Sequence, residues 1–241
     1  MPKNLKMSIY QCKKLSVVIP VYNEERTLRA IIEEVEGVIM PFEKEIILVD
    51  DHSTDRSKDI IKEYAVKHKV IIQSKNYGKG AALRKGFQAA TGDIILVQDA
   101  DLEYNPKEYP LLLQSILDGD ADVVYGSRFI TAFPRRVLYF SHYMANQLVT
   151  FLSNIFTGLN LSDMETGYKV FTKEALDKIL PCLTANRFGI EPELTAQIAK
   201  HKFRVYEVGI SYKGRTYAEG KKINWKDGLA AVWHIIRFNF F

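Results

Sequence analysis

The sequence is poor in cysteine, with only Cys12 and Cys182 among 241 residues. Two thiols cannot build the disulfide framework of a small secreted domain, which favours a reducing compartment. The polar amino end lacks the apolar stretch of a secretory signal, and no run of 18 apolar residues encodes an ordinary membrane span. We therefore expect a cytoplasmic protein. Because 47% of the residues are hydrophobic, residues 1–241 can bury one full core and are predicted to form a single domain.

The sequence also lacks a strong overall charge, since its formal net charge is only +4. This balance hides an uneven distribution. Residues 1–14 carry four lysines and no acid, residues 200–241 carry nine basic and three acidic residues, and the segment between them is net acidic. Basic ends on an acidic body indicate contact with an anion, such as a lipid surface, a phosphorylated substrate or nucleic acid. For residues 1–14 we favour a solvated basic face.

In the first half of the chain, short apolar runs alternate with amphipathic stretches. The runs are β-branched and continuous, as in parallel strands that are buried on both faces. Apolar residues at helical spacing lie between them, over 28–39 and over 60–65, and Ser53 or Thr54 can cap the second of these helices. This alternation predicts an α/β fold with a mostly parallel sheet flanked by helices. The candidate strands are Ser16–Pro20, Glu45–Asp50, Val70–Gln73, Asp93–Gln98 and Asp122–Gly126.

The second half of the chain has a different pattern. Residues 134–161 form a long aromatic and aliphatic segment. A last, amphipathic helix is predicted over Trp225–Phe241, and its apolar stripe either packs on the body of the protein or lies in a membrane interface. That stripe consists of Trp225, Leu229, Val232, Trp233, Ile236 and Phe240. The other expected elements are strands over Tyr168–Phe171 and Arg204–Tyr212 and helices around Glu174–Leu180 and Glu191–His201.

The most informative motif is Asp99-Ala100-Asp101, which follows an apolar run that ends at Val97. Two carboxylates at the carboxyl end of a strand can hold a divalent cation against a phosphate, because Mg²⁺ and Mn²⁺ accept oxygen ligands from carboxylates, water and substrate phosphates. The same spacing recurs in Asp118–Asp122, but that cluster precedes its strand, where Asp and Gly are ordinary turn residues. Ligands of open α/β sheets bind outside the carboxyl ends of the strands. We therefore assign a metal site to Asp99 and Asp101 and a turn to the later cluster.

Polar residues also follow the other predicted strands at this rim. Asp50 ends the second strand and Asp51 follows it. Turn formation explains one of these two carboxylates, and Asp51 can accept a hydrogen bond from a nucleobase or ribose. Lys79, flanked by two glycines, precedes an alanine-rich helix over 81–90, where backbone amides form a generic anion site. A rim this acidic argues against nucleic-acid binding.

Several motifs together resemble those of the inverting family 2 glycosyltransferases of the GT-A fold. In the first half these are VIPVYNEE (18–25), VDDHSTD (49–55), NYGKGAALRKG (76–86) and QDADLEYNP (98–106). The second half resembles the polyprenyl-phosphate sugar synthases, such as the dolichol-phosphate mannose synthases, through GSRF (126–129), PRR (134–136), DMETGYKVF (163–171) and YKGRTYAEGKK (212–222). The resemblance implies a nucleotide-sugar-binding half over 15–130 and an acceptor half over 131–241 with amphipathic, membrane-proximal helices.

The resemblance also implies a donor site. A divalent cation, Mg²⁺ or Mn²⁺, is expected on Asp99 and Asp101, with Asp101 also catalytic, while Glu103 is either a third ligand or a charge at a helix start. Lys79 is expected to contact substrate. The residues expected around the nucleoside are Pro20, Tyr22, Glu24, Asp51 and Ala100.

Basic residues are implied around the phosphates. The acceptor phosphate and the departing diphosphate are expected to contact side chains such as arginine, whose planar fork meets phosphate oxygens bidentately. Arg128, Arg215 and Lys222 are expected to be catalytic, because they would stabilise charge that develops on the diphosphate. The full set is Arg128, Arg135, Arg136, Arg215 and Lys222.

The function that the resemblance implies is transfer of a hexose from a nucleotide sugar, of the GDP-mannose or UDP-glucose type, to dolichyl or undecaprenyl phosphate. The chain stops at Phe241 without a membrane helix, so we expect peripheral association with the cytoplasmic membrane surface, with a membrane partner subunit as a further possibility. Two alternatives stay open. One is transfer to a hydroxyl of a glycan or lipid, with Glu191 or Glu193 as the base; the other is a non-catalytic nucleotide-sugar-binding subunit of a membrane complex.

Overall fold

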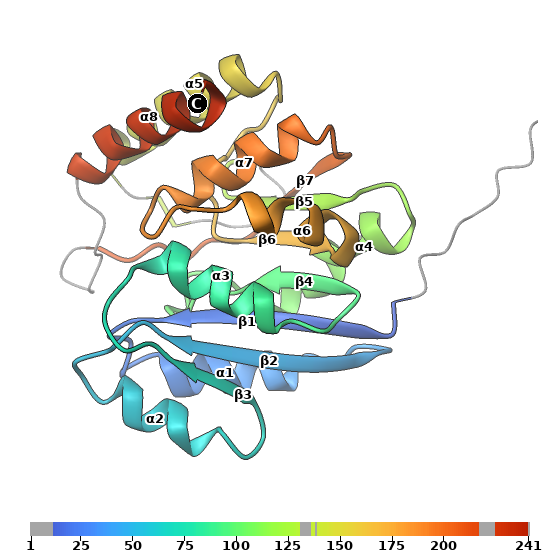
Figure 1. Cartoon of the computed structure of the whole chain (residues 1–241), viewed down its shortest axis with the longest axis vertical. Helices are drawn as coiled ribbons and strands as arrows, with labels where there is room; N and C mark the ends of the chain where they lie inside the picture. Colours follow the sequence, from blue (N-terminus) through green and yellow to red (C-terminus); the bar gives the residue numbers. More distant parts are fainter. Residues whose placement is uncertain (1–11, 131–135, 138, 217–224, 241) are drawn as a thin grey trace, which may run out of the picture.

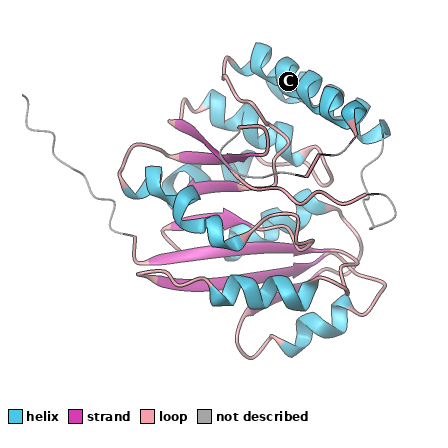
Figure 2. Ribbon diagram, turned by 180° about the vertical axis from the view of Figure 1, so that it is seen from behind, coloured by secondary structure: helices cyan, strands magenta, loops and turns pink. Residues whose placement is uncertain are grey.

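The structure is a computed structural model that describes residues 12–130, 136–137, 139–216 and 225–240. Within these ranges a seven-stranded sheet has the order β3-β2-β1-β4-β6-β5-β7, and helices cover both of its faces (Figure 1, Figure 2). The strands are β1 (Lys14–Val21), β2 (Glu43–Asp50), β3 (Lys69–Ile72), β4 (Ile94–Val97), β5 (Val123–Ser127), β6 (Lys169–Thr172) and β7 (Val205–Gly209). The helices are α1 (Leu28–Gly37), α2 (Ser57–Glu63), α3 (Lys79–Ala89), α4 (Tyr109–Leu117), α5 (Phe140–Thr157), α6 (Lys173–Ile179), α7 (Ile190–Lys200) and α8 (Trp225–Phe240).

The sheet is mostly parallel, which confirms the predicted fold class. β1 pairs in parallel with both β2 and β4, and β2 pairs in parallel with β3. β6 lies between β4 and β5 and is antiparallel to both, while β7 pairs in parallel with β5. The sheet therefore takes strands from both predicted halves, and the division into a donor half and an acceptor half stays a prediction.

The central strands are buried on both faces. Along β1, Val18 belongs to the core under α3, α6 and α7, whereas its neighbours Val17 and Ile19 belong to the core under α1, α2 and α4. A strand that is covered on both sides needs apolar residues at consecutive positions. This requirement explains why the apolar runs in the sequence are continuous rather than alternating.

α5 and α8 pack on each other and on α7, at the end of the molecule opposite α2 (Figure 1). The sequence leaves open whether the last helix packs on the body or lies at a membrane. α8 packs on the body, and its inner face buries Ala231, Ile235 and Phe238. On its outer face, Trp233 and Phe240 of the predicted stripe are exposed. The side chains of Trp225 and Leu229 are not among those that the structure describes.

The predicted cap of the second helix is wrong. α2 starts only at Ser57, where its N-cap residue Arg56 makes no side-chain cap bond and the Ser57 N–H donates to the Asp55 carboxylate. The Ser53 hydroxyl instead accepts a hydrogen bond from the N–H of Asn23, and the N–H of Thr54 donates to the Asn23 side chain. These two residues therefore join the loop after β2 to the loop after β1.

One residue of the predicted first stripe also falls outside its helix. α1 ends at Gly37, and the extended backbone of Val38 turns the chain away. Ile39 is consequently 93% exposed. The remaining apolar positions of that stripe are buried in α1 as expected.

Candidate active site

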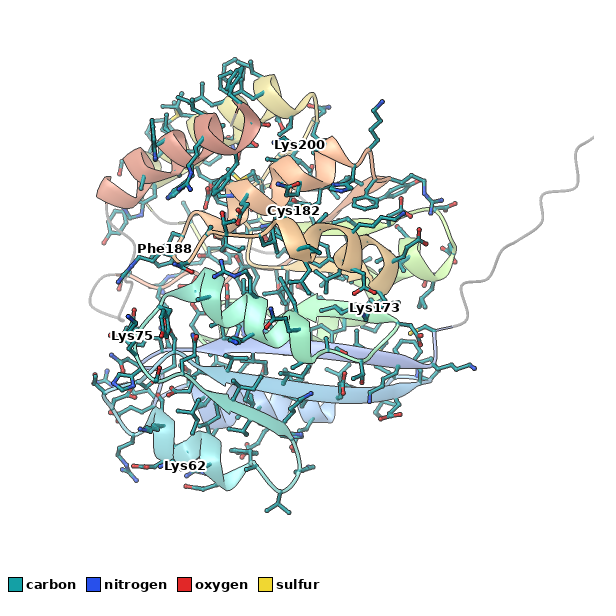
Figure 3. All side chains as sticks on the ribbon, in the orientation of Figure 1. Lys62, Lys75, Lys173, Cys182, Phe188 and Lys200 are labelled. Atoms are coloured by element: carbon teal, nitrogen blue, oxygen red, sulfur yellow. The ribbon has the colours of Figure 1, made fainter. Side chains whose placement is uncertain are left out.

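The loops that follow β1, β2 and β4 meet at one edge of the sheet. β1 and β2 end together, because Val21 pairs with Asp50, and β4 lies beside β1 in the same direction. In Figure 3 the labelled Lys75 and Phe188 lie at this edge, and Lys173 lies toward the opposite one. Most of the predicted site residues that the structure describes belong to these loops or to segments that contact them.

Each of the three loops contains one non-glycine residue in a left-handed conformation. The φ angles are 52° for Asn23, 61° for His52 and 61° for Leu102. Such conformations cost free energy and are concentrated at functional sites. Three of the four non-glycine residues in this conformation therefore lie at the edge that carries the polar residues, and the fourth, Lys202, lies before β7 at the opposite edge.

Arg215 lies at the centre of this edge, among three carboxylates. Its Nη2 atom is 2.7 Å from Asp101 Oδ2, its Nη1 atom is 3.1 Å from Glu24 Oε2, and its Nε atom is 3.2 Å from Glu103 Oε1. The segment that carries Arg215 follows β7, so residues far apart in the sequence meet here. The structure thus brings four predicted site residues together.

Lys79 provides a second cation at the start of α3. Its Nζ atom is 2.9 Å from Asp99 Oδ1 and 3.0 Å from Glu191 Oε1. The predicted anion site at this helix N-terminus already has an anionic partner, because the Gly78 N–H donates to the Asp51 carboxylate at 2.7 Å. Substrate contact by Lys79 stays a prediction, but its pairing with Asp99 is a contact that sequence reasoning missed.

Glu103 anchors the segment that carries Arg215. Its Oε2 atom accepts a hydrogen bond from the Tyr212 hydroxyl at 2.6 Å, and its Oε1 atom accepts one from the Arg215 N–H at 2.8 Å. It does not start a helix, since the next helical turn begins at Pro106. Both carboxylate oxygens are therefore engaged within the protein, while the metal-ligand assignment of Glu103 stays a prediction.

The chemistry of this edge fits a divalent cation. Burial, followed by the charges of Asp99 and Glu103, raises the pKa of Asp101 to about 7, although Arg215 acts in the opposite direction. Among the described residues, no three His, Cys, Asp or Glu side chains are arranged to hold a metal ion by themselves. A pair such as Asp99 and Asp101 is nevertheless sufficient for Mg²⁺, which commonly takes one or two carboxylates and completes its shell with water and substrate phosphates.

Asp51 fixes the loop between β3 and α3. Its carboxylate accepts hydrogen bonds from the Gln73 side chain and from the N–H groups of Tyr77 and Gly78, all within 2.8 Å. Turn formation explains the other acid of the pair, because Asp50 accepts from the N–H of Ser53. A nucleoside contact by Asp51 stays a prediction.

The remaining predicted nucleoside residues lie around the same loops. Pro20 is partly buried in β1 and Tyr22 is exposed just beyond it. Ala100 is buried, and its carbonyl oxygen accepts a hydrogen bond from the Thr27 hydroxyl at 2.8 Å. These contacts tie the Asp-x-Asp turn to the start of α1.

Arg128 is held by a buried aspartate from the acceptor half. Its Nε and Nη2 atoms each lie 2.6 Å from an oxygen of Asp163, and its guanidinium lies 5.2 Å from the centre of the Tyr212 ring. Sequence reasoning missed Asp163, although it opens the DMETGYKVF motif. Arg128 therefore contacts the same Tyr212 that hydrogen-bonds Glu103.

The other predicted basic residues are described only in part. Arg136 is exposed, its N–H donates to the Tyr212 carbonyl at 2.9 Å, and its Nη1 atom donates to the Gly214 carbonyl at 3.2 Å. It therefore lies against the segment that carries Arg215. Arg135 and Lys222 lie outside the described residues.

The two candidate bases at the start of α7 differ. Glu193 is fully engaged: its carboxylate accepts hydrogen bonds from the Thr184 N–H and hydroxyl and from the Ala185 N–H. Glu191 pairs with Lys79 through Oε1, but its Oε2 atom is buried without a hydrogen-bond partner among the described residues. Of the two, only Glu191 has a carboxylate oxygen that accepts no hydrogen bond from the described residues.

Sequence reasoning also missed a buried charged cluster beside Glu191. Glu165 Oε1 is buried and has no hydrogen-bond partner in the described part of the chain. Burial, then the charge of Glu191, raises the pKa of Glu165 to about 8. The Lys169 ammonium is fully buried and donates to the Met164 and Thr166 carbonyls. The only signal was the DMETGYKVF motif, which contains both residues.

The later aspartate cluster forms a turn, as predicted. Asp118 ends α4, Gly119 has a φ angle of 80°, and Asp122 pairs with Arg204 at 2.7 Å. The cluster lies at the amino end of β5, at the edge of the sheet opposite the loops that follow β1, β2 and β4.

Within the described residues, no helix has both the length and the hydropathy that a membrane span requires.

Residues 16–180 match the model of the family described as glycosyl transferase family 2. The chain is 29% identical over 223 residues to a dolichol-phosphate mannosyltransferase of Pyrococcus furiosus, covering 87% of this chain and 60% of that protein. It is 32% identical over 215 residues to an undecaprenyl-phosphate 4-deoxy-4-formamido-L-arabinose transferase of Aeromonas hydrophila, covering 87% and 63%. The chain thus spans less than two thirds of the length of these relatives.

The fold is shared with glucosyl-3-phosphoglycerate synthase of Mycobacterium tuberculosis, solved with Mn²⁺, uridine diphosphate and phosphoglyceric acid. The two structures align with a TM-score of 0.72 and 20% sequence identity. The alignment covers 94% of this chain and 77% of the synthase. The likeness confirms the GT-A fold.

Proposed function

Since this chain belongs to glycosyl transferase family 2, we propose that it transfers a hexose from a nucleotide sugar to the phosphate of a polyprenyl phosphate. One observation carries the proposal. The two aspartates of the Asp-x-Asp motif lie at the carboxyl end of β4, beside Arg215 and Lys79. This is an arrangement that suits a diphosphate and its metal ion. The names of the relatives, which refer to dolichol phosphate and undecaprenyl phosphate, support the acceptor class.

Asp99 and Asp101 are the proposed ligands of a Mg²⁺ or Mn²⁺ ion, which supplies Lewis-acid stabilisation of the departing diphosphate. Pro20, Tyr22, Glu24, Asp51 and Ala100 are the proposed contacts of the nucleoside. Asp51 orders the loop before α3, and hydrogen bonds between the loops after β1, β2 and β4 keep these groups in place before substrate arrives. GDP-mannose and UDP-glucose represent the proposed donor types.

Basic side chains from both predicted halves of the chain stabilise the phosphates. Arg215 and Arg128 are the proposed catalytic cations, with Arg136 beside them, because charge builds on the diphosphate as the anomeric bond breaks. Arg135 and Lys222 belong to the same proposed set. The planar guanidinium suits this task, since it meets two phosphate oxygens at once.

The state of the candidate bases supports a phosphate acceptor. A phosphate is already anionic near neutral pH and needs little general-base help, whereas a hydroxyl needs a base. Both oxygens of Glu193 already accept hydrogen bonds from the protein, and one oxygen of Glu191 holds Lys79. The second candidate function, transfer to a hydroxyl, depends on the buried Oε2 atom of Glu191.

A membrane surface is the proposed location of the acceptor. α5 contains no charged residue, and it exposes a row of large apolar side chains at helical spacing, with Phe140 at 73% and Phe151 at 61% exposure. The full row is Phe140, Met144, Leu148, Phe151 and Ile155. Exposed apolar patches of this kind are typical of membrane or protein contacts. Exposed Arg136 precedes α5 in the sequence, and exposed Arg237 belongs to α8, which packs on α5. We propose peripheral association with the cytoplasmic face, either directly or through a membrane partner subunit.

The proposal is tested in two steps with the purified protein. A thermal-shift screen of nucleotide sugars with Mn²⁺ identifies the donor, because a ligand at 100 times its dissociation constant adds about 2.7 kcal/mol to stability. The selected donor is then offered a polyprenyl phosphate or a soluble hydroxyl acceptor. We expect glycosyl transfer only to the phosphate. Transfer only to the hydroxyl acceptor contradicts the acceptor class, and binding without transfer or hydrolysis indicates a non-catalytic subunit.

A further inference from the structure

Both aspartates of the Asp-x-Asp motif already hold a cation that belongs to the chain. Asp101 accepts from Arg215 at 2.7 Å, and Asp99 accepts from Lys79 at 2.9 Å. A divalent cation that binds the two carboxylates must therefore compete with a guanidinium and an ammonium for the same oxygens. It must also overcome repulsion from two positive charges in a partly buried site, where such interactions are screened less than in water.

The two internal cations differ in how far they can move. Lys79 is the first residue of α3, and its neighbours Gly78 and Gly80 have so little space that a Cβ atom would collide with the backbone at Ala185 and Asn186. Its backbone is therefore fixed. Arg215 belongs to no helix or strand, and its long side chain can turn while its N–H stays bonded to Glu103. Lys79 is in addition held by Glu191 at 3.0 Å, so we take Arg215 as the cation that changes partner.

The guanidinium of Arg215 matches an incoming diphosphate as well as it matches its present partners. Its Nη1, Nη2 and Nε atoms all donate to carboxylates, of Glu24, Asp101 and Glu103. A planar fork of this kind recognises carboxylate and phosphate with the same bidentate geometry. A diphosphate can therefore replace Asp101 as its acceptor without leaving the guanidinium unpaired.

We infer that Arg215 couples the binding of the divalent cation to the binding of a nucleoside diphosphate group. The site then binds the ion together with the diphosphate and disfavours the ion when no diphosphate is bound. Without the diphosphate, Arg215 occupies Asp101 and disfavours the ion. With it, Arg215 moves its fork to the phosphate oxygens and leaves Asp101 to the ion. Binding of the two is then positively coupled, and the coupling is reciprocal. This inference rests on the proposed metal role of Asp99 and Asp101.

The test measures binding and not turnover. Mn²⁺ is titrated into the whole protein, with and without uridine or guanosine diphosphate. Electron paramagnetic resonance measures the Mn²⁺ that stays free. In the native chain, we expect the diphosphate to tighten Mn²⁺ binding by about tenfold or more, within the usual range of coupling between sites. In Arg215→Gln, Mn²⁺ alone should bind more tightly than in the native chain, while the diphosphate with Mn²⁺ should bind more weakly. The two affinities therefore change in opposite directions.

Two further variants complete the test. Arg204→Gln removes a cation that pairs with Asp122 at the opposite edge of the sheet, and it should leave both affinities unchanged. Arg215→Lys keeps the charge but loses the fork, so it guards against misfolding of the glutamine variant and should also weaken the coupling. If Arg215→Gln binds free Mn²⁺ no more tightly than the native chain, the inference is wrong. If the native chain binds no Mn²⁺ even with either diphosphate, the proposed metal role itself fails.

Discussion

Two pairs of aspartates with the same spacing have opposite surroundings in this protein. Asp99 and Asp101 lie in a strained turn after β4 and face cations from α3 and from the segment after β7. Asp120 and Asp122 lie in an ordinary turn before β5, where Asp122 pairs with Arg204. Position relative to the strand, and not the spacing itself, separates the candidate metal site from the turn.

The first prediction concerns the Asp-x-Asp pair. Asp99→Asn and Asp101→Asn should each reduce glycosyl transfer by at least about a hundredfold, since a lost ligand removes several kcal/mol of charge stabilisation and each 1.36 kcal/mol is worth a factor of ten. The rate of transfer at saturating donor is the measurement, with thermal unfolding to verify the fold. Asp120→Asn is the control and should change turnover little. Full activity in EDTA, or in both site variants, contradicts the metal role.

The second prediction concerns the pH dependence of stability. Glu165 has its pKa raised from 4.5 to about 8 by burial and by the charge of Glu191, so the folded protein binds a proton there that the unfolded chain has released. Stability from this group is therefore present below about pH 4.5 and is lost as pH rises toward 8. The slope is at most about 1.4 kcal/mol per pH unit, because the folded and unfolded states differ by at most one proton at this group.

Urea unfolding of the native chain and of Glu165→Gln measures this effect at about pH 5 and about pH 9. The variant should lose less stability than the native chain over this interval, because an amide cannot ionise. Glu174→Gln, at an exposed position on α6, serves as the control and should keep the native slope. Identical slopes for Glu165→Gln and the native chain would show that Glu165 ionises normally.

At the scale of elements, the sequence predicts the strands and helices of the first half well. Continuous apolar runs specify β1, β2 and β4 because both faces are buried, and the stripe from Leu28 to Val35 specifies α1. It does not predict that β6 enters the sheet antiparallel between β4 and β5. A strand with four buried residues reads the same in either direction, so its partners depend on tertiary packing.

The candidate site shows the same division between local and long-range information. The sequence identifies Asp99, Asp101 and Arg215, because each belongs to a motif. It does not identify the pairing of Lys79 with Asp99 and Glu191, since these residues come from three separate elements. Nor does it reveal that Glu103 binds Tyr212, a contact across more than a hundred residues.

The third prediction compares two helical glycines. A Cβ at Gly86 of α3 would overlap the Val18 side chain of β1, whereas a Cβ at Gly37 of α1 meets nothing within 4 Å. Gly86→Ala should therefore destabilise the protein by about 1–3 kcal/mol through overpacking. Gly37→Ala should stabilise it by about 0.4–1 kcal/mol, because alanine restricts the unfolded chain. The midpoint of urea unfolding measures both, and equal effects of the two substitutions would contradict the close approach of α3 to β1.

At the scale of the whole molecule, the apolar row of α5 and the outer face of α8 lie at one end, opposite α2 (Figure 1). α8 also contributes Ile235 and Phe238 to the core, so deleting 225–241 would damage the fold together with any docking surface. Point substitutions in the exposed row separate the two effects.

The last prediction tests docking of this end on a lipid surface. The native chain should bind anionic vesicles and bind neutral ones poorly, and binding should weaken with salt, because each Lys or Arg near an anionic leaflet contributes about 1 kcal/mol within a Debye length. Replacing Leu148 and Phe151 by glutamine should weaken vesicle binding by at least about tenfold, given the free energy of burying such side chains. Nucleotide-sugar binding should be unchanged.

The matched control replaces Ile39 and Val66, which are 93% and 100% exposed but lie away from α5 and α8, after α1 and α2. This pair should leave vesicle binding at the native level, because exposure alone does not make a docking surface. Vesicle sedimentation measures all three proteins, and thermal unfolding verifies that each is folded. Equal loss in both double variants would mean that binding follows general hydrophobicity. If the native chain does not bind anionic vesicles but glycosylates a soluble hydroxyl acceptor, the proposed membrane docking and the proposed polyprenyl-phosphate acceptor are both wrong. Transfer to a hydroxyl is then the better proposal.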